Sequence, residues 1–184
     1  MTVNIREETG EDTGAVHEIH AEAFGDDLVP RLVTRLRQRQ ATLVPRGYLA
    51  TVDDQAVGHV MLTASWLDAP RKLVDVLVLA PLGVLPQHQR RGIGTLLVAR
   101  AIEEADKAGA PLLFLEGDPA YYRERGFHEA APLGFRKPSL RIPDAAFQVV
   151  KLSAYEPWMT GTLVYAEPFW ALDCVGLRDD NNQD

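Results

Sequence analysis

An apolar run, a glycine-bearing turn and a helical pattern follow one another near the middle of the chain. They occupy residues 74–84, 89–94 and 95–108. The first N–H groups of a helix have no partner within it, and the helix dipole adds partial positive charge at the same end. Glycines in the turn let a ligand approach the backbone closely, and two adjacent arginines add charge suited to phosphate oxygens. The pattern therefore predicts a strand, turn and helix that bind a phosphate-containing ligand.

The residues after the glycines narrow the class of phosphate ligand. A P-loop needs Lys-Ser/Thr directly after them, but Thr95 is followed by leucine. A dinucleotide fingerprint needs a third glycine, and Leu97 stands at that place. The residues read instead as Gln-x-x-Gly-x-Gly, from Gln89 to Gly94. The plainer alternative is a strand-to-helix turn with a capping glycine.

The order of elements predicts a mixed α/β fold. We expect strands at 2–7, 48–52, 56–64, 73–85, 112–115, from 127, at 147–152 and at 161–165. We expect helices with an apolar face from Val16 to Ala23, then at 27–38, 93–107 and 120–125. Residues 130–145 are expected to form a loop, and the arginine-rich face of the second helix (Arg31, Arg35, Arg37 and Arg39) is expected to be solvated.

A proline interrupts the apolar run that precedes the turn. Pro81 cannot donate a ladder hydrogen bond, and Gly83 follows two residues later. Both residues favour a β-bulge. We therefore expect this strand to part from its neighbour near residues 81–84.

Length and composition limit the class of protein. The chain has 184 residues and a net charge of -7, which suits one domain and disfavours nucleic-acid binding. Its single cysteine, Cys174, excludes an intrachain disulfide and a multi-cysteine zinc site, so we expect no metal. Neither a membrane-length apolar run nor a signal pattern is present. We expect a cytoplasmic protein with a core at 3–153 and an extension at 154–184.

A second motif strengthens the interpretation of the turn. The run from Tyr122 to Phe127 reads Tyr-x-x-x-Gly-Phe, and it follows the strand expected after the central helix. Together with 79–86 and 89–94, this run resembles the GNAT superfamily of acyl-CoA-dependent N-acyltransferases, with the three motifs in the family's order. Gly117-Asp118-Pro119 further resembles an uncharacterised bacterial subgroup. The resemblance implies a mixed, mostly antiparallel central sheet, splayed at a bulged strand, with helices on both faces.

The resemblance also implies where the co-substrate would lie. Acetyl-CoA would occupy the split in the sheet, with its pantetheine arm beside the backbone of Leu82 and Val84. By match to the family, the residues around the pyrophosphate would be Gln89, Arg90, Arg91, Gly92, Ile93, Gly94 and Thr95. No metal is implied.

The implied reaction is direct attack of a neutral amine on the thioester carbonyl. A backbone N–H near Val84 would stabilise the tetrahedral oxygen, and Tyr122 would donate a proton to the departing thiolate. Residues that could act as the base, alongside water, are His59, Asp75, Glu18 and Glu22. Tyr121 is expected to pack rather than to function.

Several alternatives stay open from the sequence. The chain could bind acyl-CoA as a catalytically silent sensor, or it could bind another phosphorylated ligand. The amine acceptor, a small molecule or a protein amino group, is not identified, and a homodimer is left open. Four aromatic residues either line an acceptor cleft or pack in the core: Trp66, Trp158, Phe169 and Trp170.

Overall fold

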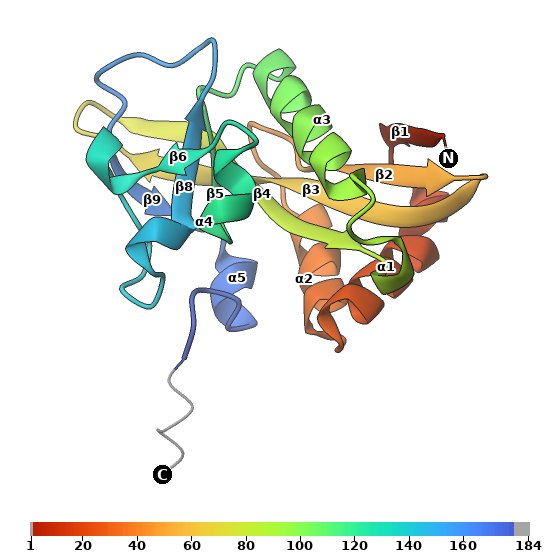
Figure 1. The fold of residues 1–184 in the computed structure, drawn as a ribbon. Coiled ribbons are helices and arrows are strands. Elements are labelled where there is room, and N and C mark those ends of the chain that lie inside the picture. Colours follow the sequence, from red (N-terminus) through yellow and green to blue (C-terminus); the bar gives the residue numbers. More distant parts are fainter. Residues whose placement is uncertain (1, 179–184) are drawn as a thin grey trace.

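Nine strands join in one sheet in the computed structural model, which describes residues 2–178 (Figure 1). The strands are β1 (Val3–Glu7), β2 (Arg46–Val52), β3 (Gln55–Asp68), β4 (Leu73–Val84), β5 (Leu112–Glu116), β6 (His128–Glu129), β7 (Phe135–Arg136), β8 (Phe147–Lys151) and β9 (Gly161–Val164). The helices are α1 (Thr13–Phe24), α2 (Leu28–Arg37), α3 (Ile93–Lys107), α4 (Pro119–Arg123) and α5 (Glu167–Ala171). Short 3-10 turns are η1 (Gly10–Asp12), η2 (Pro86–His88), η3 (Ala131–Leu133) and η4 (Asp144–Ala146).

The strand order is β1-β2-β3-β4-β5-β8-β6, with β9 paired to β3 and β7. The β4–β5 and β7–β9 pairs are parallel, whereas the other strand pairs of the described chain are antiparallel. The predicted mixed, mostly antiparallel fold is therefore confirmed. The C-terminal segment adds β9 to the central strand β3, so this part of the chain packs on the core.

The sheet opens between β4 and β5. Their only paired positions in the described chain are Leu77 with Leu113 and Val78 with Phe114, so β4 has no β5 partner from Leu79 onward. On its other side β4 stays paired with β3 as far as Val84. The predicted separation is thus present on the β5 side, and it begins two residues before the proline that suggested it.

The expected bulge lies at the same place. Val60 pairs with Leu82 and Leu62 pairs with Leu79, so one residue of β3 faces two residues of β4, Ala80 and Pro81. A proline lacks the N–H that a regular ladder needs, which explains why the extra residue is accommodated here.

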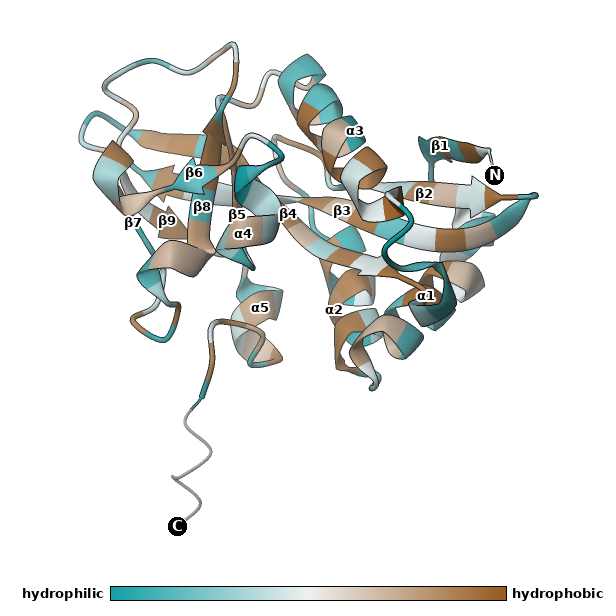
Figure 2. Cartoon of the chain, in the orientation of Figure 1, coloured by the Kyte–Doolittle hydropathy of each residue, from teal (hydrophilic) through white to brown (hydrophobic). Residues whose placement is uncertain are grey.

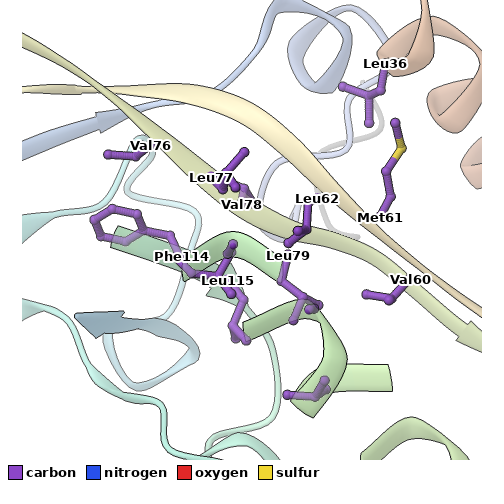
Figure 3. Packing of buried hydrophobic residues seen from close by; sticks show 14 of the residues in the cluster. Leu36, Val60, Met61, Leu62, Val76, Leu77, Val78, Leu79, Phe114 and Leu115 are labelled. Carbon is purple, nitrogen blue, oxygen red and sulfur yellow. The ribbon is translucent and has the colours of Figure 1, made fainter. Parts of the chain in front are cut away.

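Helices cover both faces of the sheet. In Figure 1, α3 lies on one face, and α1 and α2 lie on the other. A Cβ added to Gly58 would meet Ile93 and Leu97 of α3, whereas one added to Gly83 would meet His20 of α1. Figure 2 shows apolar central strands and a polar loop joining β4 to α3. Figure 3 shows Met61 of β3 directed toward Leu36 of α2, and both side chains are buried.

Two predictions of local structure were wrong. Residues 130–145 contain β7 and two 3-10 turns, because Phe135 is buried and its strand pairs with β9. The arginine-rich face of α2 is only partly solvated. Arg37 pairs with Glu8, and Arg39 donates to the Ala64 carbonyl at 2.8 Å, since both lie beside the sheet. Residues 179–184 of the expected C-terminal extension lie outside the described residues.

No helix in residues 2–178 combines the length and apolar character needed to cross a bilayer.

Candidate active site

A cleft of about 650 Å³ opens where β4 and β5 diverge. One side is β4 at 79–82, and another is the end of β5 with the turn that leads into α4. The first two helices and the C-terminal segment close it. Its lining residues are Phe24, Asp26, Leu28, Val29, Leu32, Leu79, Ala80, Pro81, Leu82, Glu116, Gly117, Asp118, Tyr122, Tyr165, Phe169, Cys174, Gly176 and Leu177.

A second hollow of about 280 Å³ lies at the start of α3. It is lined by Leu82, Val84, His88, Gln89, Arg90, Ile93, Gly94 and Tyr121. Leu82 belongs to both hollows, so they follow one another along the unpaired edge of β4. We call these two adjoining hollows the groove: the loop suggested by the sequence lines one of them, and Tyr122 lines the other.

The loop before α3 presents a set of free N–H donors. Across residues 2–178, no hydrogen bond is donated by the backbone N–H groups of 90–95, and the first helical bond runs from Leu96 to Gly92. Arg90 and Gly92 have φ angles of 57° and 84°, in the left-handed region. Such turns direct successive N–H groups to one side, and the helix dipole adds positive charge there. Arg90 and Arg91 are exposed beside the loop. The arrangement suits an anion.

The edge of β4 is free to pair with an extended ligand. The N–H of Leu85 donates to the Val57 carbonyl at 2.9 Å. Because backbone groups alternate in direction along an antiparallel ladder, Val84 and Leu82 direct their N–H groups away from β3, toward the groove. The side-chain amide of Gln89 donates to the Val84 carbonyl at 3.0 Å, which ties the loop to the strand. In this structure Gln89 therefore supports the loop.

Tyr121, expected only to pack, reaches the loop. A Cβ at Gly94 would overlap its phenol oxygen. The guanidinium of Arg125 lies 3.6 Å from the centre of the Tyr121 ring and donates to Thr95 Oγ1 at 2.7 Å through Nη2. The Thr95 hydroxyl thus accepts from arginine and keeps its own proton for a ligand. Sequence reasoning missed this cluster because its members meet only in the fold.

Tyr122 lines the other hollow of the groove. Its ring packs edge-on against Phe127, with centroids 5.8 Å apart, and a Cβ at Gly117 would overlap it. In the described part of the chain, no group hydrogen-bonds its phenol oxygen. Burial raises the pKa of this phenol well above its ordinary value, so it carries its proton at neutral pH. The group can donate a proton into the cleft.

Glu116, which the sequence reasoning did not single out, shares the cleft with Tyr122. Burial raises the pKa of its carboxyl, and the N–H of Gly176 donates to Oε2 at 3.3 Å. The available signal was an acidic residue directly after the buried strand residues 112–115. A carboxylate whose pKa is raised binds a proton more strongly than an ordinary carboxylate, so Glu116 can accept a proton in the cleft.

The four side chains proposed as a base lie elsewhere. His59 is fully buried and donates or accepts within a network with His20 and Glu8. Asp75 accepts from the Trp66 indole at 3.2 Å, and Glu18 and Glu22 are exposed on α1.

Four aromatic residues were candidates for the lining of an acceptor cleft. Of these four, Phe169 lines the cleft between β4 and β5. Trp66 packs beside Arg39, Trp158 packs beside Arg71, and Trp170 is 43% exposed on α5. Within residues 2–178, no three or more His, Cys, Asp or Glu side chains are grouped so that they could hold a metal ion.

Comparison with known proteins identifies relatives of this chain. Residues 13–135 match the model of the acetyltransferase (GNAT) family. The uncharacterized N-acetyltransferase YjhQ of Escherichia coli is 29% identical over 161 residues, which is 85% of this chain and 88% of that protein.

Two solved structures share the fold. The E. coli GNAT family N-acetyltransferase YhbS, in complex with CoA, matches with a TM-score of 0.80 and 27% identity, covering 91% of each chain. A GNAT family acetyltransferase from Brucella melitensis, in complex with acetyl-CoA, has a TM-score of 0.72 and 25% identity, covering 91% of this chain and 98% of that one.

Proposed function

Because this chain belongs to the GNAT acetyltransferase family, we propose that it transfers an acetyl group from acetyl-CoA to a primary amine. The observation that carries the proposal is the pair of adjoining hollows along the free edge of β4, one with free N–H donors and the other with the Tyr122 phenol. The CoA and acetyl-CoA held by the two structural relatives have the length and the diphosphate that such a groove suits.

Each part of acetyl-CoA has a matching feature. The diphosphate lies against the N–H groups of 90–95, with charge from Arg90 and Arg91 and the Thr95 hydroxyl nearby. The pantetheine amides pair with the free edge of β4 at Leu82 and Val84, as an added strand would. The thioester then reaches the cleft that contains Tyr122.

The chemistry is direct nucleophilic attack. The amine nitrogen bonds to the thioester carbonyl carbon, and the free N–H of Leu82, the β4 residue that lines both hollows, stabilises the oxyanion that forms. The carbon–sulfur bond then breaks, and Tyr122 donates its proton to the sulfur while the amine proton passes to Glu116, directly or through water. The alternative is a sensor that binds acyl-CoA in the same groove but does not transfer the acetyl group.

Two measurements test the proposal together. Coenzyme A should raise the melting temperature by mass action, more than ADP or inorganic phosphate at the same concentration. Acetyl-CoA with a panel of primary amines should release free thiol in proportion to the acetylated amine. Stabilisation without thiol release from any amine would favour the sensor, and no stabilisation would contradict the proposed binding site.

The first turn of α3 offers a specific test of the diphosphate site. In Gly94→Ala the new Cβ would displace Tyr121 from the loop, so we expect the Kd for CoA to rise roughly tenfold, equal to about 1.4 kcal/mol. Gly14→Ala is a matched control, because Gly14 occupies the same place in α1 and its Cβ would meet no atom within 4 Å. Isothermal titration calorimetry with CoA measures both. Equal affinities in the two variants would argue against a diphosphate beside Gly94.

A further inference from the structure

The C-terminal segment forms one wall of the cleft. The match to the family model ends at residue 135, whereas five lining residues lie in 165–177: Tyr165, Phe169, Cys174, Gly176 and Leu177. Hydrogen bonds donated by two of its backbone N–H groups hold the segment in place, together with an ion pair between Arg141 and Asp173 at 3.4 Å. The N–H of Gly176 donates to Glu116, and that of Leu177 donates to the Arg141 carbonyl at 3.2 Å. This wall therefore lies outside the region that matches the family model.

The facing wall comes from the first two helices. Its apolar members are Phe24, Leu28, Val29 and Leu32. Figure 1 shows α2 and α5 on the same side of the sheet, beneath the point where β4 and β5 separate, and the two helices are in contact. A ligand body between these walls would meet aromatic and aliphatic side chains on both sides.

The charge of the cleft has one sign. Asp26, Glu116 and Asp118 are acidic, and none of the described lining residues is Lys, Arg or His. Such a lining attracts an ammonium group and repels a carboxylate. A second ammonium at the far end of a ligand would lose water against the apolar walls, where Asp26 is the one acidic side chain among the described lining residues at 24–32, and this loss of water is costly.

We infer that the acceptor is a monoamine whose single amino group is carried on an apolar or aromatic body, and that residues 165–177 select it. This inference rests on the proposed acetyl transfer. The acidic groups draw the ammonium end toward Tyr122, and the apolar walls bind the body.

Matched pairs of amines test the inference by thiol release. Phenethylamine and phenylalanine differ by a carboxylate, and hexylamine and 1,6-diaminohexane differ by a second amino group. We expect kcat/KM to be roughly tenfold higher for the monoamine in each pair, equal to about 1.4 kcal/mol, because the acidic lining repels a carboxylate and the apolar walls disfavour a second ammonium. Equal or reversed preference would overturn the inference while leaving acetyl transfer established.

Variants of the walls provide a second measurement. Leu177 is 72% exposed in the cleft, so Leu177→Ser should fold normally and raise the KM for phenethylamine roughly fivefold, with the KM for acetyl-CoA unchanged. Leu140→Ser, at a position 94% exposed and outside the lining, is the control. An unchanged amine KM in Leu177→Ser would contradict a selecting wall.

The charge is tested separately. Asp26 Oδ1 accepts the Leu28 N–H at 2.9 Å, and asparagine keeps that acceptor, so Asp26→Asn removes charge alone. We expect a roughly threefold higher amine KM, and no change in the exposed neighbour variant Asp27→Asn. The result with CoA separates a failure of this inference from a failure of the proposed function. If CoA stabilises the protein but no monoamine is acetylated, the inferred acceptor class is wrong. If CoA does not stabilise the protein, the proposed acetyl-CoA site is contradicted.

Discussion

Tyr122→Phe is expected to lower kcat roughly 100-fold and to leave the Kd for CoA unchanged. The substitution removes only the phenol oxygen, and in the described chain this oxygen holds no neighbour in place. The ring contacts with Phe127 and Gly117 remain, so the fold of the cleft is kept. Without a proton donor, coenzyme A must leave as a free thiolate, which slows breakdown of the tetrahedral intermediate.

The pH dependence of turnover sharpens this prediction. A general acid works only while protonated, and burial raises the pKa of the Tyr122 phenol above its ordinary value near 10. In the wild type, activity should therefore show no loss from this group as pH rises from 7 to about 10. Tyr155→Phe, outside the cleft and beside Lys151, is the matched control and should keep full activity. Wild-type kcat in Tyr122→Phe would exclude the role as acid.

Those parts of the site whose residues are close together in the chain could be predicted from the sequence. The bounds of α3 at 93–107 match the prediction, because apolar periodicity and the glycine turn both lie within that stretch. The bulge could be predicted from Pro81, because a proline lacks an N–H and this disturbs the strand pairing at the proline itself. The loop at 89–94 carries the free N–H groups that the glycines suggested.

The parts that depend on distant contacts could not be predicted. Three contacts of the site and its surroundings exist only once the sheet has formed. They join Tyr121 to Gly94, Glu116 to Gly176 and His20 to His59. Residue type alone does not distinguish a packing tyrosine from one beside an anion site. The cleft wall at 165–177 likewise lies in the extension whose role the sequence leaves open, because β9, which precedes it, pairs with a strand about 100 residues earlier in the chain.

A buried chain of two histidines and a glutamate lies behind β4. Glu8 accepts from Arg37, and His59 Nε2 lies 3.0 Å from Glu8 Oε2. His59 Nδ1 lies 2.8 Å from His20 Nε2. If Glu8 is ionised, His59 donates to it through Nε2 and accepts from His20 through Nδ1, so His20 Nδ1 is left as an acceptor. That atom is buried with no partner in the described residues, and it lies against Gly83.

The buried histidine pair should therefore make this protein less stable at acidic pH. Burial, then the nearby charges of His59 and Arg37, lower the pKa of His20 to about 3, and burial lowers that of His59. A histidine with a depressed folded-state pKa contributes stability above its unfolded pKa near 6.5, and that stability is lost as pH falls toward the folded value. For His20 alone, we expect the free energy of unfolding to drop by about 2 kcal/mol between pH 7.5 and pH 5. Urea unfolding at each pH measures it.

The glutamate extends the same trend to lower pH. Burial raises the pKa of Glu8, but hydrogen bonds from His59 and Arg37 outweigh it and bring the pKa to about 2, so further stability is lost below about pH 4.5. His20→Leu should make the fall between pH 6.5 and 5 shallower, since residue 20 then no longer takes up a proton on unfolding and only His59 remains of the buried pair. His17→Leu, at an exposed position on the same helix, should keep the wild-type slope. Equal slopes in the His20 and His17 variants would show that the buried pair does not govern acid stability.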